Sequence, residues 1–331
     1  MLDMLLSVEG LKMVFENKVQ SFTAVDELSF SIKRGETLGI VGESGSGKTM
    51  SSLSVMRLLP NQGRITDGKV IFEGNNILTL NEKEMYKIRG NKISMIFQDP
   101  MMSLDQVYTV GFQIVEALKA HKKISKIDAE KKALNLLESV GIPHPERVFR
   151  CYPFELSGGM CQRIMIAIAL SCRPKLLFAD EPTTALDVTV QAQILDLLKK
   201  MQKEYEMGIV LITHDLGVVA DIADRILVMY AGKSMENATT NEIFNKPLHP
   251  YTVGLMKSIP HLDTENHRLY SINGTVPDIR SMPKGCRFCT RCPFVINQCN
   301  EKEPEMKEVE KGHFVRCFRA EEILKGELNI E

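Results

Sequence analysis

The sequence predicts an α/β protein built on a parallel β-sheet, and three observations support this fold class. Short apolar runs, typical of buried strands, alternate along the chain with runs whose apolar residues recur at helical spacing. One strand-like run stops at a glycine-rich turn, and a later one ends in two carboxylates. Strands and helices in alternation are the pattern of a parallel sheet covered by helices.

The individual elements follow in chain order. Residues 20–42 form short β-like runs, of which the last, residues 36–41, is compact and apolar. Further strand-like runs lie at residues 68–72, 92–97, 176–179 and 226–230. Apolar residues recur at helical spacing from Ala133 to Val140, where Gly141 supplies a stop, and again from Val190 to Tyr205.

The composition is that of a globular chain of more than one domain. The chain has 331 residues, of which 44% are hydrophobic and 25% charged, and these values exclude a disordered, collagenous or membrane-spanning protein. Its 41 basic and 42 acidic residues leave a net charge of −1, so no global basic field points to nucleic acid. Residues 164–172, the longest apolar stretch, are far short of the roughly 20 residues of a membrane helix.

The ends of the chain differ in character. The first residues lack a basic start and a small-residue cleavage site, so we expect no secretory signal. Beyond residue 230 the chain becomes richer in proline and turn residues. We therefore expect a large domain over residues 1–258 and a C-terminal extension over residues 259–331.

Residues 42–49 read Gly-Glu-Ser-Gly-Ser-Gly-Lys-Thr and match a phosphate-binding loop that follows a strand and begins a helix. Glycines let backbone N–H groups converge on a phosphate, and the helix N-terminus adds partial positive charge. The Lys48 ammonium reaches the β- and γ-phosphate oxygens, and the Thr49 hydroxyl is a ligand for Mg²⁺. The predicted nucleotide contacts are Gly42, Ser44, Gly45, Ser46, Gly47, Lys48, Thr49 and Met50.

The strand-like run 176–179 leads directly to Asp180 and Glu181. Asp180 suits the coordination shell of Mg²⁺, and Glu181 is placed to polarise a water for attack on the γ-phosphate. On its own, such a pair at a strand end is more often a helix cap or a solvated turn. The phosphate loop in the same chain favours the catalytic interpretation.

A second turn rich in small residues, Ser157-Gly158-Gly159-Met160, stands before a helix-like apolar run. It offers another set of N–H groups at a helix start, and hence a second anion site. Two phosphate-binding turns so far apart in one sequence are explained simply if two chains meet head to tail. Each chain then presents its Ser-Gly-Gly turn to the nucleotide held by the phosphate loop of the other.

These residues resemble the ATP-binding subunits of ABC transporters over about residues 5–258. The loop 42–49 is similar to the Walker A motif, residues 176–181 to Walker B, and residues 156–160 to the signature motif, with Met160 where many members have Gln. The resemblance implies a P-loop ABC ATPase domain, in which a RecA-like parallel-sheet core carries a helical signature subdomain over about residues 100–170.

Four further positions gain roles from this resemblance. Gln98 resembles the Q-loop glutamine, which joins the Mg²⁺ and water shell to the membrane-facing surface, and Ala185-Leu186-Asp187 resembles the D-loop at the dimer seam. His214 resembles the switch histidine that senses the γ-phosphate. Phe15 is in register with the adenine-stacking aromatic residue, with Phe22 as the alternative.

Finer features resemble the dipeptide/oligopeptide/nickel importer branch, and within it the D-type subunit. Residues 98–110 are similar to the extended Q-loop of that branch, and His249-Pro250-Tyr251-Thr252 is a second hallmark. The sequence departs from the branch pattern beside the signature turn and on the expected permease contact, at Cys161, Met102, Asp105 and Gln106.

Five of the eight cysteines lie within 32 residues, at Cys286, Cys289, Cys292, Cys299 and Cys317. Thiolates at such spacings can surround a metal. The branch resemblance implies a [4Fe–4S] cluster on Cys286, Cys292, Cys299 and Cys317, with Cys289 as the rival ligand and Zn²⁺ as the alternative metal. Four arginines neighbour the cysteines: Arg287, Arg291, Arg316 and Arg319. We interpret them as solvated or charge-balancing groups rather than a nucleic-acid patch, because acidic residues also occur in this part of the sequence.

Taken together, the resemblance implies an ATPase that energises the import of di- or oligopeptides from the cytoplasmic face of the cell membrane. The implied partners are a second ABC ATPase subunit, in a heterodimer rather than a homodimer, two transmembrane permease subunits and an extracytoplasmic substrate-binding protein, and no nucleic acid. Two alternatives remain: a nickel importer of the same branch, and a soluble ABC ATPase whose cysteine unit is a nucleic-acid-binding zinc module.

Overall fold

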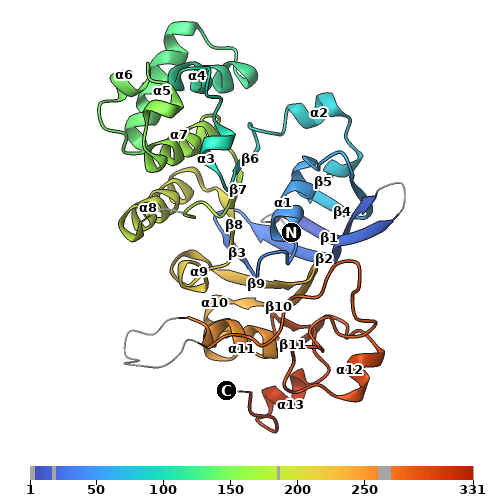
Figure 1. Ribbon diagram of the computed structural model, residues 1–331. Coiled ribbons are helices and arrows are strands. Elements are labelled where there is room, and N and C mark those ends of the chain that lie inside the picture. The colour runs from blue at the N-terminus through green and yellow to red at the C-terminus, as the bar shows by residue number, and fades with distance from the viewer. Residues whose placement is uncertain (1–3, 17–19, 185–186, 260–269, 331) are drawn as a thin grey trace. The chain divides into compact units, whose positions relative to one another are not determined.

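The computed structural model describes residues 4–16, 20–184, 187–259 and 270–330 (Figure 1). The chain divides into two compact units. The first unit consists of Met1–Leu5, Lys33–Glu36 and Thr79–Leu211, and the second of Leu6–Ile32, Thr37–Leu78 and Ile212–Glu331. Each is described here by itself.

The first unit is built on buried parallel strands. Its strand order is β8 (Gly208–Thr213), β7 (Leu176–Asp180) and β6 (Ile93–Ile96), and the last two residues of β8 belong to the second unit. β6 and β7 pair in parallel, and every residue of these two strands is buried. A strand buried on both faces needs apolar residues at successive positions, which explains why both strands were predictable as continuous apolar runs.

Helices make up the rest of the first unit. They are α2 (Glu82–Tyr86), α3 (Pro100–Ser103), α4 (Val110–His121), α5 (Lys126–Ser139), α6 (Pro145–Val148), η2 (Pro153–Glu155), α7 (Gly158–Leu170) and α8 (Val188–Tyr205). The two helices predicted from apolar spacing are confirmed as α5 and α8, which bury Leu137 and Leu198 respectively. No helix in the described ranges is long and apolar enough to cross a membrane.

The second unit contains a sheet of strand order β2 (Ser21–Lys33), β1 (Met4–Glu16), β4 (Gly63–Phe72) and β5 (Asn75–Asn76), followed by η1 (Ile77–Thr79). β1 pairs antiparallel with β4, with register shifts between Glu9 and Met13. The sequence did not predict β1, and β2 is one strand of 13 residues rather than several short runs.

A further set of strands in the second unit has the order β11 (Lys307–Glu310), β12 (His313–Val315), β10 (Lys233–Thr239), β9 (Arg225–Tyr230) and β3 (Thr37–Val41). β3 and β9 are parallel, whereas β10, β11 and β12 pair antiparallel. The C-terminal strands β11 and β12 thus extend the sheet beyond β10. The domain boundary expected near residue 258 stays a prediction.

The helices of the second unit are α1 (Lys48–Met56), α9 (Leu216–Ile222), α10 (Thr240–Asn245), α11 (Pro250–Lys257), α12 (Asn297–Glu301) and α13 (Ala320–Leu324). Figure 1 shows α12 and α13 in the red C-terminal part of the chain, beside β11. Leu248, just before α11, forms a small apolar core with Val315 and Ala320. This core and the β10–β12 pairing anchor the C-terminal segment.

Charged side chains also fasten the C-terminal segment to β2. The Lys233 ammonium lies 3.3 Å from Asp26, 3.1 Å from Glu27 and 2.7 Å from Glu303, and its side chain is only 3% exposed. The Arg287 guanidinium donates to Asp26 and to the Ala231 carbonyl. Burial alone would raise the pKa of Asp26, but Lys233 and Arg287 hold that pKa below its usual range.

This network corrects one sequence-based interpretation. Arg287 and Arg316 were interpreted as solvated or charge-balancing groups, but both are buried, with 8% and 7% of their surface exposed. Arg287 pairs with Asp26, and Arg316 donates hydrogen bonds to the Ser234 and Pro304 carbonyls. A buried guanidinium needs such partners because an unpaired charge away from water is strongly destabilising.

Replacing Lys233 should therefore destabilise the second unit. The Lys233→Ala change removes a buried ammonium and leaves Asp26, whose side chain is 14% exposed, with one cation fewer, so we expect the free energy of unfolding to fall by about 3 kcal/mol. Lys246→Ala is the matched control, because Lys246 pairs with Glu310 at 2.9 Å with side chains 48% and 39% exposed. The control should lose less than about 1 kcal/mol. Chemical denaturation followed by circular dichroism measures both, and equal losses would contradict the role given to the network.

Candidate functional site

The phosphate-binding loop has the predicted strand–turn–helix context. β3 ends at Val41 and α1 begins at Lys48. Gly47 caps α1 with a φ of 96°, and a Cβ atom there would lie 2.8 Å from the Ala24 carbonyl oxygen. Both the positive φ and this close approach require glycine. The turn therefore brings the N-terminus of a helix to the end of a buried strand, the arrangement that binds phosphate.

The polar groups of this loop face inward onto the loop itself. The Lys48 ammonium donates to the Gly42 carbonyl at 2.6 Å and to the Glu43 carbonyl at 3.0 Å. The buried Ser46 hydroxyl has no hydrogen-bond partner among the described residues. Thr49 and Met50 follow in the first turn of α1 and are partly exposed. The Lys48 ammonium is thus bonded to carbonyl groups of the loop itself. Phosphate oxygens could replace these carbonyls as its acceptors.

Glu43, the second residue of the loop, is held from two sides. Its backbone N–H donates to the Tyr251 hydroxyl at 2.9 Å. Its carboxylate accepts two hydrogen bonds from the Arg291 guanidinium, at 2.7 and 3.0 Å. Tyr251 is fully buried, and the Arg291 side chain is only 4% exposed. Sequence reasoning noted both residues for other reasons and missed these contacts.

In the first unit, the structure brings Gln98 and Glu181 together. The Gln98 amide donates to Glu181 Oε2 at 2.9 Å, and the Thr184 hydroxyl donates to the same oxygen at 2.9 Å. Glu181 has a φ of 46°, a conformation that costs free energy for a residue other than glycine and is concentrated at functional sites. Asp180, the last residue of β7, is 2% exposed. The carboxylate of Glu181 is therefore held in a defined orientation by two donors.

The Ser-Gly-Gly turn begins α7. The Ser157 hydroxyl caps the helix by accepting from the Met160 N–H, and a Cβ atom on Gly158 would meet nothing within 4 Å. No described part of the chain therefore requires glycine at position 158. Next to the turn, the Cys161 thiol is buried and donates to the Pro153 carbonyl at 3.4 Å. Cys161 thus has a packing role inside the first unit.

Gln162 joins this helix to the residue after Glu181. It is 2% exposed, and its amide donates to the Pro182 carbonyl at 2.6 Å. Nothing in the local sequence pattern pointed to Gln162 or to Thr184, because their partners are reached only after the chain has folded. Gln162 connects the helix that follows the predicted signature turn to Pro182. Thr184 contacts Glu181, the predicted water-orienting residue.

The remaining predicted residues have simpler surroundings. His214 is exposed between β8 and α9, and Asp187 caps α8 by accepting from the Val190 N–H at 2.9 Å. Ala185 and Leu186 of the predicted D-loop lie outside the described residues. Phe15 and Phe22 are both partly exposed, so the choice between them as the adenine-stacking residue stays open.

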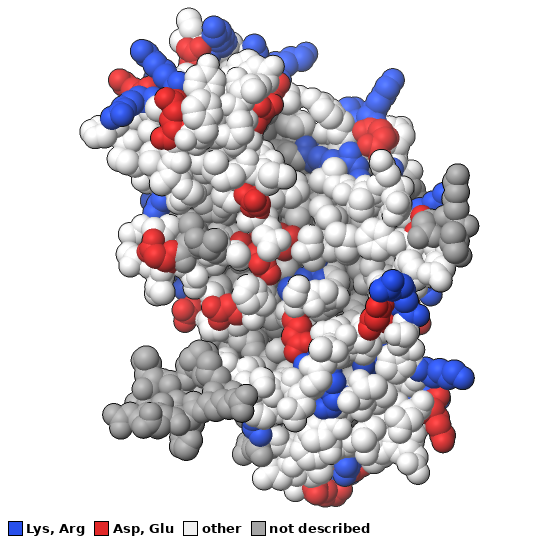
Figure 2. Space-filling view, viewed as in Figure 1, with Lys and Arg blue, Asp and Glu red and all other residues white. Residues whose placement is uncertain are grey.

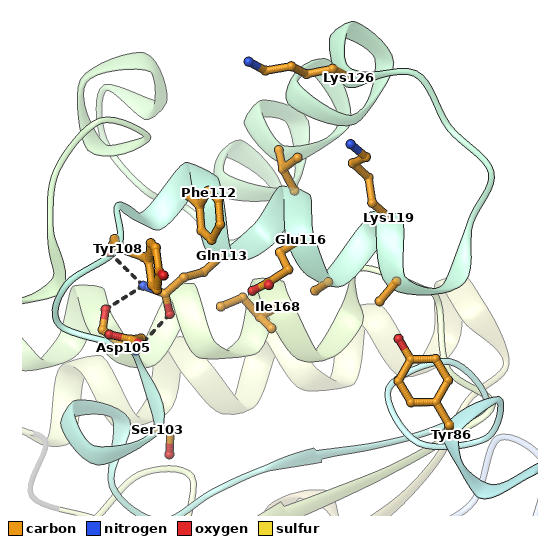
Figure 3. Close-up of a pocket in the computed structure, with 13 residues that line it drawn as sticks. Tyr86, Ser103, Asp105, Tyr108, Phe112, Gln113, Glu116, Lys119, Lys126 and Ile168 are labelled. Atoms are coloured by element: carbon orange, nitrogen blue, oxygen red, sulfur yellow. Dashed lines mark hydrogen bonds between the residues drawn. The ribbon is translucent and has the colours of Figure 1, made fainter. Parts of the chain in front are cut away.

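A groove of about 1040 Å³ lies in the first unit among α2, α4, α5 and α7 (Figure 3). One wall is the segment before α4, which Gln113 fastens by donating to the Asp105 and Tyr108 carbonyls. Tyr108 and Phe112 stack with their ring centroids 4.5 Å apart on this wall. The Gln106 amide donates to the Met101 carbonyl at 2.9 Å. The departures from the branch pattern at Asp105 and Gln106 therefore take part in holding the segment's shape.

The five clustered cysteines line one cavity in the second unit, together with apolar and aromatic side chains such as Phe288, Phe294 and Phe318. Gly285 allows this convergence, because a Cβ atom there would lie 2.2 Å from the Cys299 carbonyl oxygen. The Cys286 N–H donates to that same carbonyl at 2.8 Å. The segment containing Cys286 thus packs against α12 at Cys299.

Burial, with a smaller contribution from neighbouring cysteines, raises the pKa of the Cys286 and Cys317 thiols to about 12. Cys286, Cys292 and Cys317 each interact with the backbone N–H two residues later in the chain, at Phe288, Phe294 and Arg319, and this N–H favours the thiolate. Within the described ranges, no three Cys, His, Asp or Glu side chains form a group that could hold a metal ion. The five cysteines nevertheless line the same cavity.

Comparisons with known proteins agree with these features. The family model "ABC transporter" matches residues 25–184, and "Oligopeptide/dipeptide transporter, C-terminal region" matches residues 235–299. The oligopeptide transport ATP-binding protein AppD of Bacillus subtilis is 50% identical over 319 residues, which cover 96% of this chain and 97% of AppD. The chain belongs to the ATP-binding subunits of oligopeptide/dipeptide ABC transporters.

Two other members of this family have similar identity. OppD of Escherichia coli is 48% identical over 97% of this chain and 95% of its own, and DppD of Haemophilus influenzae is 50% identical over 92% of each chain. Among solved structures, the ATP-binding cassette MJ0796, in a dimeric post-hydrolysis state bound to ADP and Pi, superposes with a TM-score of 0.65 at 28% identity. It covers 71% of this chain and 99% of its own.

In this peptide-type ATP-binding subunit, the contact between Thr184 and Glu181 has a testable consequence. Thr184→Val keeps the shape of the side chain but removes one of the two donors to Glu181 Oε2. Hydrogen bonds to a charged group contribute about 1.5–3 kcal/mol when buried, and Thr184 is exposed, so we expect kcat for ATP hydrolysis to fall about tenfold. KM should be unchanged. Steady-state kinetics tests this, with Thr189→Val on the exposed surface of α8 as the control; an unchanged kcat would show that Thr184 does not orient Glu181.

Proposed function

We propose that this chain is the ATP-hydrolysing subunit that energises an ABC importer of di- or oligopeptides. The observation that carries the proposal is the identity of about half of all residues, over more than nine-tenths of each chain, with subunits named for oligopeptide and dipeptide transport. The strand–loop–helix geometry of residues 42–49 supports ATP as the substrate.

The loop and the first turn of α1 bind the triphosphate. Backbone N–H groups of Gly45, Ser46 and Gly47 donate to phosphate oxygens, and the Lys48 ammonium exchanges the Gly42 and Glu43 carbonyls for the β- and γ-phosphates. Thr49, Asp180 and Gln98 would hold Mg²⁺, which neutralises charge on the phosphate oxygens when bound. Oxygen donors of this kind are those that Mg²⁺ prefers.

Hydrolysis then depends on the orientation of a water molecule. Glu181 accepts a hydrogen bond from the attacking water and so aligns its oxygen with the γ-phosphorus. Gln98 and Thr184 keep the Glu181 carboxylate in place, which supports this role. His214 contacts the γ-phosphate and senses its loss. Cleavage removes the charge that bridges the two halves of the site, and the site reopens.

A second ATP-binding chain completes each site. The Ser157-Gly158-Gly159 turn is exposed at a helix start, and the open space around Gly158 supports an occupant from outside the described chain. Met160 lies next to this turn, and Asp187 lies at the start of α8. Both residues take part in the contact with the second chain. We propose that the second chain is a related but different ATPase.

The groove beside α4 is the proposed contact with the permease. Several apolar side chains of the segment that leads into α4 are exposed, among them Met102 at 86% and Val107 at 72%. Apolar surface of this kind marks an interaction site on a protein. Two transmembrane permease subunits and an extracytoplasmic binding protein complete the importer, and the chain itself lies on the cytoplasmic face of the membrane.

The alternatives differ in their partner. On the face that Figure 2 shows, basic and acidic side chains are interspersed, without the stripe of basic residues expected of a nucleic-acid-binding protein. This distribution favours the importer over the soluble ATPase with a zinc module. A nickel importer of the same branch would share every nucleotide contact. A transport assay is therefore the experiment that distinguishes peptide from nickel as the cargo.

We also propose that the cysteine cavity holds a [4Fe–4S] cluster on Cys286, Cys292, Cys299 and Cys317. All four of these cysteines line one cavity, and thiolates are the ligands that hold iron–sulfur clusters. The backbone N–H groups that face three of the four sulfurs are of the kind that stabilises cluster thiolates. Cys289 also lines the cavity and is the alternative ligand.

The water-orienting role is tested by Glu181→Gln. This change removes the carboxylate but keeps its shape, so ATP should bind with unchanged affinity while turnover falls at least about a hundredfold. Lys48→Ala is the matched variant, in which affinity for ATP is lost instead. Equilibrium binding of ATP and steady-state hydrolysis separate the two effects, and normal hydrolysis by Glu181→Gln would refute the assignment.

In the assembled transporter, the same Glu181→Gln change should stop uptake of a labelled oligopeptide. Excess unlabelled peptide should compete in the wild-type transporter, and excess nickel should not. Competition by nickel alone would favour the nickel importer.

The cluster is tested by composition. Protein purified without oxygen should contain iron and acid-labile sulfide in equal amounts and absorb broadly in the visible range. Cys317→Ser should lose both, because it removes one cluster ligand, whereas Cys151→Ser should keep both because Cys151 lies outside the cavity. Zinc without sulfide in the wild-type chain would replace the cluster by the zinc alternative.

A further inference from the structure

Arg291 connects the cysteine segment, residues 286–292, to the phosphate loop. Cys289 and Cys292 line the cavity, and between them Arg291 extends to the carboxylate of Glu43, which is 248 residues away in the sequence. The pair is bidentate, with N–O distances of 2.7 and 3.0 Å. This geometry is the most specific that an arginine–carboxylate pair can form.

The rest of the Arg291 side chain is equally constrained. Its guanidinium also donates to the Asn273 carbonyl at 3.0 Å, the Ile272 carbonyl at 3.2 Å and the Tyr230 hydroxyl at 3.3 Å. It lies over the rings of Tyr230 and Phe288, 5.7 and 5.9 Å from their centroids. A guanidinium with this many partners has one orientation, and it transmits that orientation to Glu43.

An aromatic cluster provides a second, parallel connection. Phe288, which lies between Cys286 and Cys289, packs against Tyr230 and Tyr251 with centroids 5.3 Å from each. Tyr251 in turn accepts the N–H of Glu43. The side chain and the main chain of the same loop residue are thus both held by groups that contact the cysteine segment.

We propose that Arg291 is a positioning residue for nucleotide binding: it couples the cysteine segment to the phosphate loop through Glu43, so that the conformation of the segment sets the affinity for ATP. Two physical effects act in the same direction. The clamp keeps the loop in one conformation before the nucleotide arrives, which reduces the entropy lost on binding. The guanidinium also neutralises a carboxylate on a loop that must receive a polyanion.

The coupling is reciprocal. If one conformation of the segment binds ATP more tightly than another, then ATP shifts the equilibrium between these two conformations by the same factor. The inference rests on the proposed role of residues 42–49 as the nucleotide-binding loop. It gives the cysteine segment a regulatory connection to that loop, and this connection does not depend on the proposed cluster.

The test measures the dissociation constant of a fluorescent ATP analogue for the full-length chain. Arg291→Ala should raise that constant about tenfold, within the usual range of coupling between sites. Arg291→Lys should give an intermediate value, because an ammonium keeps the charge but loses the bidentate geometry. The decisive variant combines Arg291→Ala with Glu43→Gln. If Arg291 acts through the charge of Glu43, the double variant binds more tightly than Arg291→Ala alone; weaker binding would overturn the inference.

Arg280→Ala is the matched control, because Arg280 forms an exposed ion pair with Asp278 in the same part of the chain. An Arg291→Ala variant that binds like this control would also overturn the inference. Lys48→Ala separates this outcome from a failure of the proposed function. If Lys48→Ala abolishes binding while Arg291→Ala matches the control, only the coupling fails; if Lys48→Ala binds normally, the loop is not the nucleotide site.

Amide hydrogen exchange provides a readout that does not depend on activity or on folding of an Arg291 variant. In the wild-type chain, ATP should slow exchange in residues 286–292. Glu43→Gln changes no residue of the cysteine segment but removes the charge that Arg291 pairs with, so it should reduce this slowing while the chain still binds ATP. Slowing as large as in the wild-type chain would show that the segment is not coupled through this pair.

Discussion

The main chain of residues 42–49 must be held in an uncommon conformation before any phosphate is bound, and most of the second unit contributes to this constraint. The loop has its own cation bonded to its carbonyls and a glycine in the left-handed region at the helix start. Tyr251 and Arg291 supply what the loop lacks, a partner for the Glu43 N–H and a counter-charge for its carboxylate. The C-terminal segment therefore helps to hold the loop that is proposed to bind the nucleotide.

Buried charge gives this architecture its connectivity. Lys233 and Arg287 join β2 to the C-terminal segment through Asp26, and Glu303 completes the group. Taking such groups out of water is unfavourable unless each finds its partners, so the native arrangement is the one that satisfies all of them at once. These ion pairs thus fix the position of the C-terminal segment relative to β2.

Local features of the fold and site could be predicted from the sequence. The strands β3 and β7 are apolar at successive positions, and the loop and the carboxylates at their ends are specified by adjacent residues. β1 was missed because its buried positions are interrupted by register shifts near Lys12, so neither a continuous run nor a strict alternation is visible.

Long-range contacts were beyond such reasoning. Arg291 has five donors, and no local pattern indicates that they go to Glu43 and not to solvent or to the cysteine cavity. Thr184 and Gln162 are similar cases, because their roles arise from the folding of β7 and α7 into one unit. Of the two interpretations of Arg287 and Arg316, solvated or charge-balancing groups, the first is wrong for the same reason.

Cys317 lies two residues after the end of β12, and this position has a consequence for biosynthesis. β12 joins the sheet through β10, and Val315 packs with Leu248 and Ala320, so the last thiol reaches the cavity only when this strand has paired. During translation, the other four clustered cysteines leave the ribosome before the fifth is available. The cavity therefore gains its last cysteine only after β12 has been synthesised and has paired with β10.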